Sequence, residues 1–300
     1  MVSVVIPTYN ASRYLDAQLK ALRAQSVKEL EILVIDSSSS DRTLEIAKEY
    51  AVQTLSIRKE EFEHGGTRTL AGKTRSVGDI LVYLTQDALP RNDEAIETLI
   101  QPLLTEHKCG VAFGRQIPYQ DATPFAQHLR LFNYPSQSYV RTYADRTALG
   151  IRAAFCSNSF AAYRRKALES VGWFKTGLLM GEDMYACAKM LKQGYHVAYV
   201  ADAAVYHSHN YSLRQEFKRY FDLGVFLKKE QWILDEFGTP EGEGLRFIRA
   251  ELSFLVRTGY PHYVPLSLLR ATAKGLGYRL GHLYRHVPRW LIRRVSMHST

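Results

Sequence analysis

GDILVYLTQDALP, at residues 78–90, is the stretch that decides the fold, because it leads from an apolar run into a polar turn. The run Ile80 to Leu84 is uninterrupted, as expected of a parallel strand covered by helices on both faces. Asp87 follows it, so the strand delivers one carboxylate to its carboxyl end. Ligands of open α/β sheets bind at this edge. Asp87 is therefore predicted to hold a cation or a ribose.

A second role for Asp87 is to cap the helix that begins near Asn92. Pro90 stands between the two, however, and Asn92 or Asp93 is better placed as the cap. The pattern therefore favours a binding role.

Strands and helices alternate around this stretch, and that rhythm predicts an α/β, Rossmann-like fold with a mostly parallel sheet flanked by helices. Residues 118–149 are predicted as loops and short helices over the mouth of the sheet. We expect a catalytic domain at 1–212 and a helical C-terminal region at 213–300. Strands are expected at 2–6, 31–35, 53–57, 79–84, 110–115, 159–163 and 197–200, and helices at 11–25, 41–50, 93–106, up to 171 and 182–193.

Polar groups follow the predicted strands in the order that a nucleotide-sugar site requires. Thr8 to Asn10 follows the first strand, Asp36 the second and Asp87 the fourth, and Glu182 and Asp183 open a later helix.

Four segments that carry these groups resemble the inverting glycosyltransferases of family 2, which have the GT-A fold: VSVVIPTYN (2–10), ILVIDSSSSD (32–41), GDILVYLTQDALP and GEDMYACAKMLKQGY (181–195). The resemblance covers about residues 1–210. FEHGGTRTLA (62–71), LTQDALP (84–90) and HSHNYSL (207–213) are similar to bacterial rhamnosyltransferases. Those enzymes use dTDP-L-rhamnose to build surface polysaccharide. The resemblance implies transfer of L-rhamnose to a saccharide or lipid-linked acceptor.

The resemblance also implies a nucleotide site. Asp36 would accept the N3 hydrogen of the pyrimidine, and Pro7, Thr8 and Tyr9 would line the nucleoside pocket. The alternative for Asp36 is a turn residue in the Ser-rich loop that follows it.

Arg68 and Gln86 are predicted to contact the nucleotide sugar. Arg68 follows His64-Gly65-Gly66, which we expect to be flexible backbone that can approach a base or a diphosphate closely. His64 is equally an ordinary loop histidine.

Asp87 matches the metal-binding acid of the family's DxD motif, although Thr85 replaces the first acid. A hard cation would then need donor phosphate oxygens and a further protein ligand. His207 and His209 lie in the region where this fold often supplies one, and the alternative for each is a hydrogen bond within its loop. The expected cofactor is Mg²⁺ or Mn²⁺, and imidazole modestly favours Mn²⁺.

Glu182 and Asp183 match the family's ED motif, in which the Asp is the usual catalytic base. We expect the helix N-terminus to keep it ionised, as a base requires. Alternatively, both acids only complement the helix dipole. Gly181, which permits close approach of a sugar, favours a function.

The C-terminal region carries most of the net charge of +9, because no Asp or Glu follows Glu251. From Leu269 a helical projection places apolar residues on one stripe and basic residues off it, and Pro288 precedes a second basic segment around Trp290. This pattern suits an anionic membrane surface. In the alternative, the stripe packs on the catalytic domain. Binding to nucleic acid is not favoured, because no recognised fold accompanies the charge. The stripe is Leu269, Ala273, Leu276, Leu280 and Leu283.

No apolar run reaches the ~20 residues of a membrane span, and no signal peptide precedes the first strand. Three dispersed cysteines suit a reducing compartment. We therefore expect a cytoplasmic protein, peripheral at the inner face of the cell membrane.

The loop after the first strand bears on other enzyme classes. A sugar nucleotidyltransferase would carry a Gly-rich phosphate loop after the first strand, and a dehydrogenase would carry GxGxxG there; Pro7 to Asn10 matches neither. The remaining alternatives are a family 2 transferase that uses another nucleotide sugar, and a degenerate nucleotide-sugar-binding protein.

Overall fold

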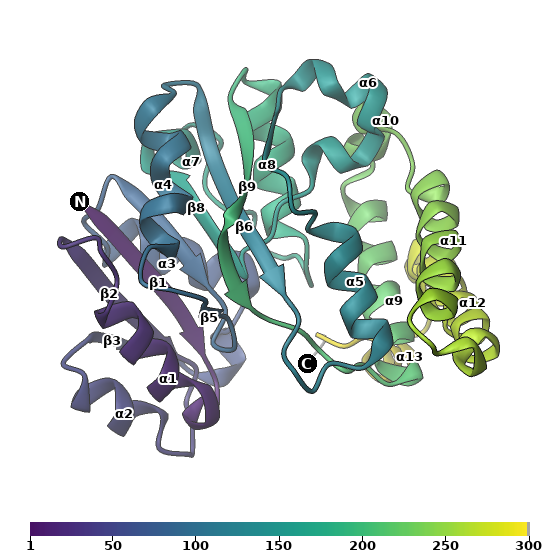
Figure 1. The fold of residues 1–300 in the computed structure, drawn as a ribbon, viewed down its shortest axis with the longest axis horizontal. Helices are drawn as coiled ribbons and strands as arrows, with labels where there is room; N and C mark the ends of the chain where they lie inside the picture. The colour runs from purple at the N-terminus through teal and green to yellow at the C-terminus, as the bar shows by residue number, and fades with distance from the viewer. Residues whose placement is uncertain (299–300) are drawn as a thin grey trace.

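The computed structural model describes residues 1–298 and is built around a nine-stranded sheet (Figure 1). The strand order is β3-β2-β1-β4-β8-β6-β9-β5, with β7 paired to β9. The strands are β1 (Val2–Thr8), β2 (Leu30–Asp36), β3 (Gln53–Ser56), β4 (Ile80–Leu84), β5 (Leu89–Pro90), β6 (Cys109–Ile117), β7 (Tyr139–Arg141), β8 (Phe160–Arg164) and β9 (His196–Tyr206).

The sheet is mostly parallel, as predicted. In the described chain, β1, β2, β3, β4, β6 and β9 run in one direction, whereas β5, β7 and β8 run in the other. The predicted α/β fold class is therefore confirmed. The strand β8 is antiparallel to both of its neighbours, so its start lies at the same edge as the carboxyl ends of β4 and β6.

Helices cover both faces of the sheet (Figure 1). Val4 and Ile6 pack with α1 and α4 on one face, and Val5 between them packs with α3 and α8 on the other. The helices are α1 (Ser12–Arg23), α2 (Thr43–Glu49), α3 (His64–Thr74), α4 (Ala95–Thr105), α5 (Pro124–Asn133), α6 (Arg146–Leu149), α7 (Arg165–Ser170), α8 (Glu182–Lys192), α9 (Leu213–Lys229), α10 (Gln231–Phe237), α11 (Glu241–Arg257), α12 (Val264–His282) and α13 (Arg289–Val295).

The prediction of flexible backbone at residues 64–68 is wrong, because these residues form the first turn of α3. The glycines of this helix serve packing. A Cβ atom on Gly65 would lie 2.1 Å from the carbonyl oxygen of Lys175, and one on Gly72 would lie 2.4 Å from the hydroxyl of Tyr83. The low helix propensity of glycine is thus outweighed by the close approach of α3 to the core.

Strand β9 is longer than predicted and continues to Tyr206. Its register with β6 shifts between Gly114 and Arg115, and the exposed Asp202 lies within that irregular stretch. The extension brings His207 to the ligand-binding edge.

The C-terminal helices form a layer beside the sheet, with α12 packed along α9 (Figure 1). Glycines allow this contact: a Cβ atom on Gly281 would lie 2.1 Å from the carbonyl oxygen of Phe221. Three of the five residues of the apolar stripe face outward, Leu269 at 52%, Leu276 at 57% and Leu283 at 56% exposed, whereas Ala273 and Leu280 are half-buried. The alternative that this stripe packs on the catalytic domain is therefore wrong for its three outward-facing leucines. No helix within residues 1–298 is both long and apolar enough to cross a membrane.

Candidate active site

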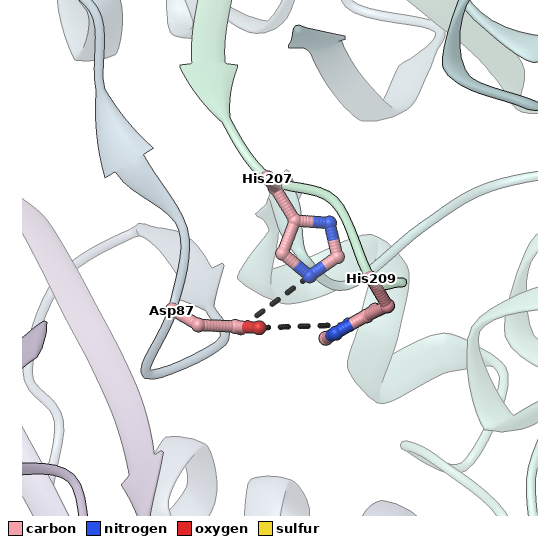
Figure 2. A group of neighbouring side chains, drawn as sticks. All are labelled: Asp87, His207 and His209. Carbon is pink, nitrogen blue, oxygen red and sulfur yellow. Dashed lines mark ion pairs between the residues drawn. The ribbon is translucent and has the colours of Figure 1, made fainter. Parts of the chain in front are cut away.

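Asp87, His207 and His209 converge at the carboxyl edge of the sheet (Figure 2). Asp87 lies beyond β4, and both histidines follow β9. The Nε2 atom of His207 lies 3.3 Å from Asp87 Oδ1, and the Nε2 atom of His209 lies 3.5 Å from Asp87 Oδ2. The three ligand atoms lie within 4.8 Å of one another. The structure thus brings the acid and both candidate histidines together.

Gln116 orients one of these imidazoles. Its Oε1 atom lies 2.8 Å from Nδ1 of His207, and its Nε2 atom donates to the Ser157 hydroxyl at 2.9 Å. Since the amide oxygen accepts, Nδ1 carries the hydrogen and the lone pair of Nε2 faces Asp87.

Both imidazoles are neutral at pH 7. Burial lowers the pKa of His207, and burial together with His207 lowers the pKa of His209 to about 4. A carboxylate and two neutral imidazoles that face one another form a suitable donor set for a divalent cation. One oxygen and two nitrogen ligands favour Mn²⁺ over Mg²⁺ and leave positions for phosphate oxygens and water.

The acids at the start of α8 have different surroundings. Glu182 is buried, and its Oε1 atom accepts from Arg68 at 3.2 Å and from the Asn158 side chain at 3.1 Å. Within residues 1–298, the Asp183 oxygens accept from two backbone N–H groups, those of Asn158 at 3.1 Å and Met184 at 2.8 Å. The Glu182 carboxylate is therefore held by an arginine and an amide, whereas Asp183 has no cation among its hydrogen-bond partners in the described chain.

Asp183 is not kept ionised as the sequence predicted. Burial, and next the charge of Glu182, raises the pKa of Asp183 to about 7. Burial acts to raise the pKa of Glu182, but the charge of Arg68, the charge of His64 and the hydrogen bond from Asn158 together outweigh it, and that pKa falls below its ordinary value. Glu182 is thus ionised at pH 7, whereas Asp183 is partly protonated. Two neighbouring carboxyl groups whose pKa values differ in this way are expected of an acid–base site.

Gly181 is required for a reason other than the one predicted. Its φ of +84° lies in the left-handed region, and a Cβ atom there would lie 2.6 Å from the ring of Phe226. The glycine therefore lets α8 pack on α9.

Asp36 is completely buried and organises the Ser-rich turn, the alternative role that the sequence allowed. Its Oδ1 atom accepts from Thr8 at 3.1 Å and from the Ser39 hydroxyl at 2.5 Å, and its Oδ2 atom accepts from the Ser39 backbone at 2.9 Å. A carboxylate oxygen can accept two hydrogen bonds, so Oδ2 retains capacity for an imide hydrogen.

Gln86 binds the loop after β1. Its side chain accepts from the backbone N–H of Tyr9 at 2.8 Å and donates to the Tyr9 carbonyl at 3.2 Å. The Tyr9 ring is 39% exposed, and Lys59 lies 4.5 Å from its centroid. Pro7 is buried within β1. Tyr9 is thus the predicted nucleoside residue with an exposed ring.

Arg68 is buried, and its partners are Glu182 and the carbonyl oxygen of His64. Sequence reasoning missed Asn158, which contacts both acids. The sequence did contain a signal for it, because Ser157-Asn158-Ser159 is a polar triplet directly before an apolar strand. This strand is antiparallel to its neighbours, so its start lies at the same edge as the site.

Solved structures share this fold. A mannosyltransferase from Pyrobaculum calidifontis, solved in complex with GDP-Man and Mn²⁺, aligns with a TM-score of 0.58 at 19% identity, covering 98% of this chain and 85% of that one. S. aureus TarS in complex with UDP-GlcNAc aligns with a TM-score of 0.57 at 18% identity, covering 95% and 91%. The chain therefore has the GT-A fold.

The sequence profile described as Glycosyl transferase family 2 matches residues 3–172. The chain is 41% identical over 300 residues to the O-antigen chain rhamnosyltransferase RfbN of Salmonella typhimurium, covering 100% of this chain and 95% of the relative. It is also 41% identical to the O-antigen chain rhamnosyltransferase WbaN of Salmonella anatum, covering 99% and 94%. This protein belongs to glycosyl transferase family 2, and it is a glycosyltransferase.

Proposed function

We propose that this glycosyltransferase moves L-rhamnose from dTDP-L-rhamnose to a saccharide or lipid-linked acceptor of bacterial surface polysaccharide. The observation that carries the proposal is full-length similarity to two O-antigen chain rhamnosyltransferases. The site supports the proposal, because the candidate metal cluster and Asp183, whose pKa is about 7, lie at the same edge of the sheet.

Asp183 is the proposed general base. It takes the proton from an acceptor hydroxyl while that oxygen forms a bond to the anomeric carbon. The bond from that carbon to the diphosphate oxygen breaks on the opposite face, and the electron pair leaves with the nucleoside diphosphate. A single displacement of this kind inverts the configuration. Glu182 acts through Asp183, because its Oε1 atom is held by Arg68 and Asn158 and its negative charge raises the pKa of Asp183.

Asp87, His207 and His209 are the proposed ligands of a divalent cation, Mn²⁺ or Mg²⁺. When bound, such a cation acts as a Lewis acid toward phosphate oxygens. The chain's own part is to hold three ligand atoms together and to exclude a proton from both imidazoles.

The nucleoside is proposed to lie on Tyr9, beside Pro7 and Thr8, with its imide hydrogen directed to Asp36. Gln86 is proposed to shape this pocket by fixing the Tyr9 backbone. Arg68 is proposed to act on the nucleotide-sugar site by positioning Glu182 beside Asp183.

A donor panel tests the proposal. Release of nucleoside diphosphate is measured from dTDP- and UDP-sugars, with Mn²⁺ or EDTA and with membrane-lipid extract as the source of acceptor. We expect metal-dependent release from dTDP-L-rhamnose that requires the extract. Release confined to another donor would assign a different sugar. Donor binding without release from any donor would indicate a degenerate site.

The rate is expected to depend on the protonation state of Asp183. A general base must be deprotonated, and the pKa of this carboxyl is about 7. We therefore expect kcat to fall about tenfold per pH unit below pH 7 and to level off above about pH 8. The measurement is kcat at saturating donor between about pH 5.5 and about pH 9. A flat profile across this interval would contradict the assignment.

We further propose that α12 and α13 bind an anionic membrane surface. Apolar side chains that would normally be buried are exposed there, including Leu276 at 57%, Leu283 at 56% and Trp290 at 61%. The accompanying charge is entirely basic after Glu251. Exposed apolar residues among cations match the chemistry of an acidic lipid surface. The exposed basic residues are Arg279, Arg285, Arg289, Arg293 and Arg294.

Co-sedimentation with vesicles tests this surface. We expect binding to phosphatidylglycerol vesicles, weak binding to phosphatidylcholine vesicles, and weakening with salt. Combined replacement of Leu276, Leu283 and Trp290 by serine should lower vesicle affinity at least about tenfold. The matched control is Leu104→Ser, at a residue 58% exposed on α4. A wild-type protein that stays in the supernatant with anionic vesicles would refute the surface.

A further inference from the structure

One face of α9 is directed toward the acids of α8. Arg219, Asp222 and Phe226 are spaced three and four residues apart and therefore share a face of the helix. Phe226 packs directly on Gly181, the residue before the acid pair. Asp222 is buried, and its Oδ2 atom accepts from the backbone N–H groups of residues 297 and 298. Arg219 is one turn from Asp222 and two turns from Phe226.

Arg219 also connects to the candidate metal cluster. Its guanidinium carbon lies 5.8 Å from the centroid of the Tyr211 ring, and the Tyr211 ring stacks on the His209 ring at 5.1 Å. His209 in turn lies 3.5 Å from Asp87. Arg219 therefore lies on the helix face that packs beside the acid pair, and it is linked to the Asp87 cluster through the Tyr211 and His209 rings.

Arg219 forms no ion pair with a carboxylate within residues 1–298, and its guanidinium lies over the Tyr211 ring. Its neighbour on the helix, Glu216, is already bound by Arg270 and Lys274. Arg219 is thus a half-buried cation that no carboxylate in this part of the chain neutralises. A second arginine, the buried Arg130, donates to the His207 carbonyl nearby. Two cations in this region favour the binding of an anion.

We propose that Arg219 contacts the diphosphate of the donor and stabilises the charge that develops on it as the glycosidic bond breaks. The guanidinium offers a planar fork of N–H donors that matches phosphate oxygens. The role rests on the proposed function, because the anion is the donor's nucleoside diphosphate. Arg219 lies outside the segments that resemble the family, so no motif points to it.

Isothermal titration of dTDP and of thymidine, in the presence of Mn²⁺, tests the role. Arg219→Gln should weaken dTDP binding by about 10- to 100-fold and leave thymidine binding unchanged, since the lost contact is to phosphate. Arg219→Lys keeps the charge and should recover part of the affinity. The matched control is Arg214→Gln, an exposed arginine on the same helix.

The outcomes separate this role from the proposed function. Equal dTDP affinity of the wild-type protein and the Arg219→Gln variant would overturn the role of Arg219 alone. Equal weakening of dTDP and thymidine binding would also overturn it, because the effect would then be a general loss of structure. A wild-type protein that binds neither dTDP nor UDP would overturn the proposed function and this role with it.

Discussion

Replacing Asp183 with asparagine is expected to lower kcat by about 10²- to 10⁴-fold while donor affinity stays within about twofold of wild type. Asparagine keeps the shape of the side chain and can still accept from the backbone of Met184, but it cannot take a proton. Two effects on stability oppose each other: the amide NH₂ group cannot accept the Asn158 N–H that Oδ2 of Asp183 accepts, and this costs about 1 kcal/mol. The folded-state pKa of Asp183 lies above its ordinary value, so the ionised carboxylate costs stability as the pH rises toward 7, and the neutral amide removes that cost.

The measurement combines initial rates at saturating donor with titration of donor into each protein. Asp202→Asn is the matched control, because Asp202 is an exposed carboxylate on β9. A variant that turns over at the wild-type rate would remove Asp183 from the mechanism. Loss of donor binding together with turnover would assign it to the donor site instead.

Replacing Asp87 with alanine is expected to weaken Mn²⁺ binding by at least about 100-fold and to reduce transfer to background. Mutation of a residue that merely supports a ligand already costs about 10- to 100-fold in metal affinity, and Asp87 is the carboxylate that faces both imidazoles. Its removal leaves two neutral nitrogen donors and no negative charge to balance a divalent cation.

Titration of Mn²⁺ followed by electron paramagnetic resonance measures this affinity without any turnover. Asp93→Ala is the matched control, at an exposed acid six residues along the chain. His207→Ala and His209→Ala are expected to weaken binding as well, and the comparison between them decides whether one or both imidazoles are ligands. Unchanged Mn²⁺ affinity in the Asp87 variant would place the metal elsewhere.

Much of the fold follows from local patterns in the sequence. The run Ile80–Leu84 and its counterparts at the first two strands are buried on both faces, so their apolar character alone predicts parallel strands. Polar residues at the ends of those strands therefore meet at one edge whatever the details of packing. That is why Asp87 and the loop after the first strand could be assigned from sequence.

The remaining features depend on contacts between distant segments. The glycines of α3 predict a flexible loop when the sequence is considered alone. Only the folded structure shows that Gly65 packs against Lys175 and Gly72 against Tyr83. The stripe of α12 was predicted as a membrane-facing or a packed surface, and only the contact with α9 shows that three of its leucines face outward. The raised pKa of Asp183 arises from burial beside Glu182, which a helix-dipole argument does not contain.

The central claim, inverting transfer of rhamnose, is tested most directly by following the sugar. Purified protein is incubated with dTDP-L-rhamnose labelled in the sugar, Mn²⁺ and a bacterial lipid extract, and the lipid product is isolated for determination of its anomeric configuration. We predict label in the lipid fraction, in a linkage of configuration opposite to that of the donor. A product of retained configuration, or labelling of the lipid only from a different nucleotide sugar, would contradict the account.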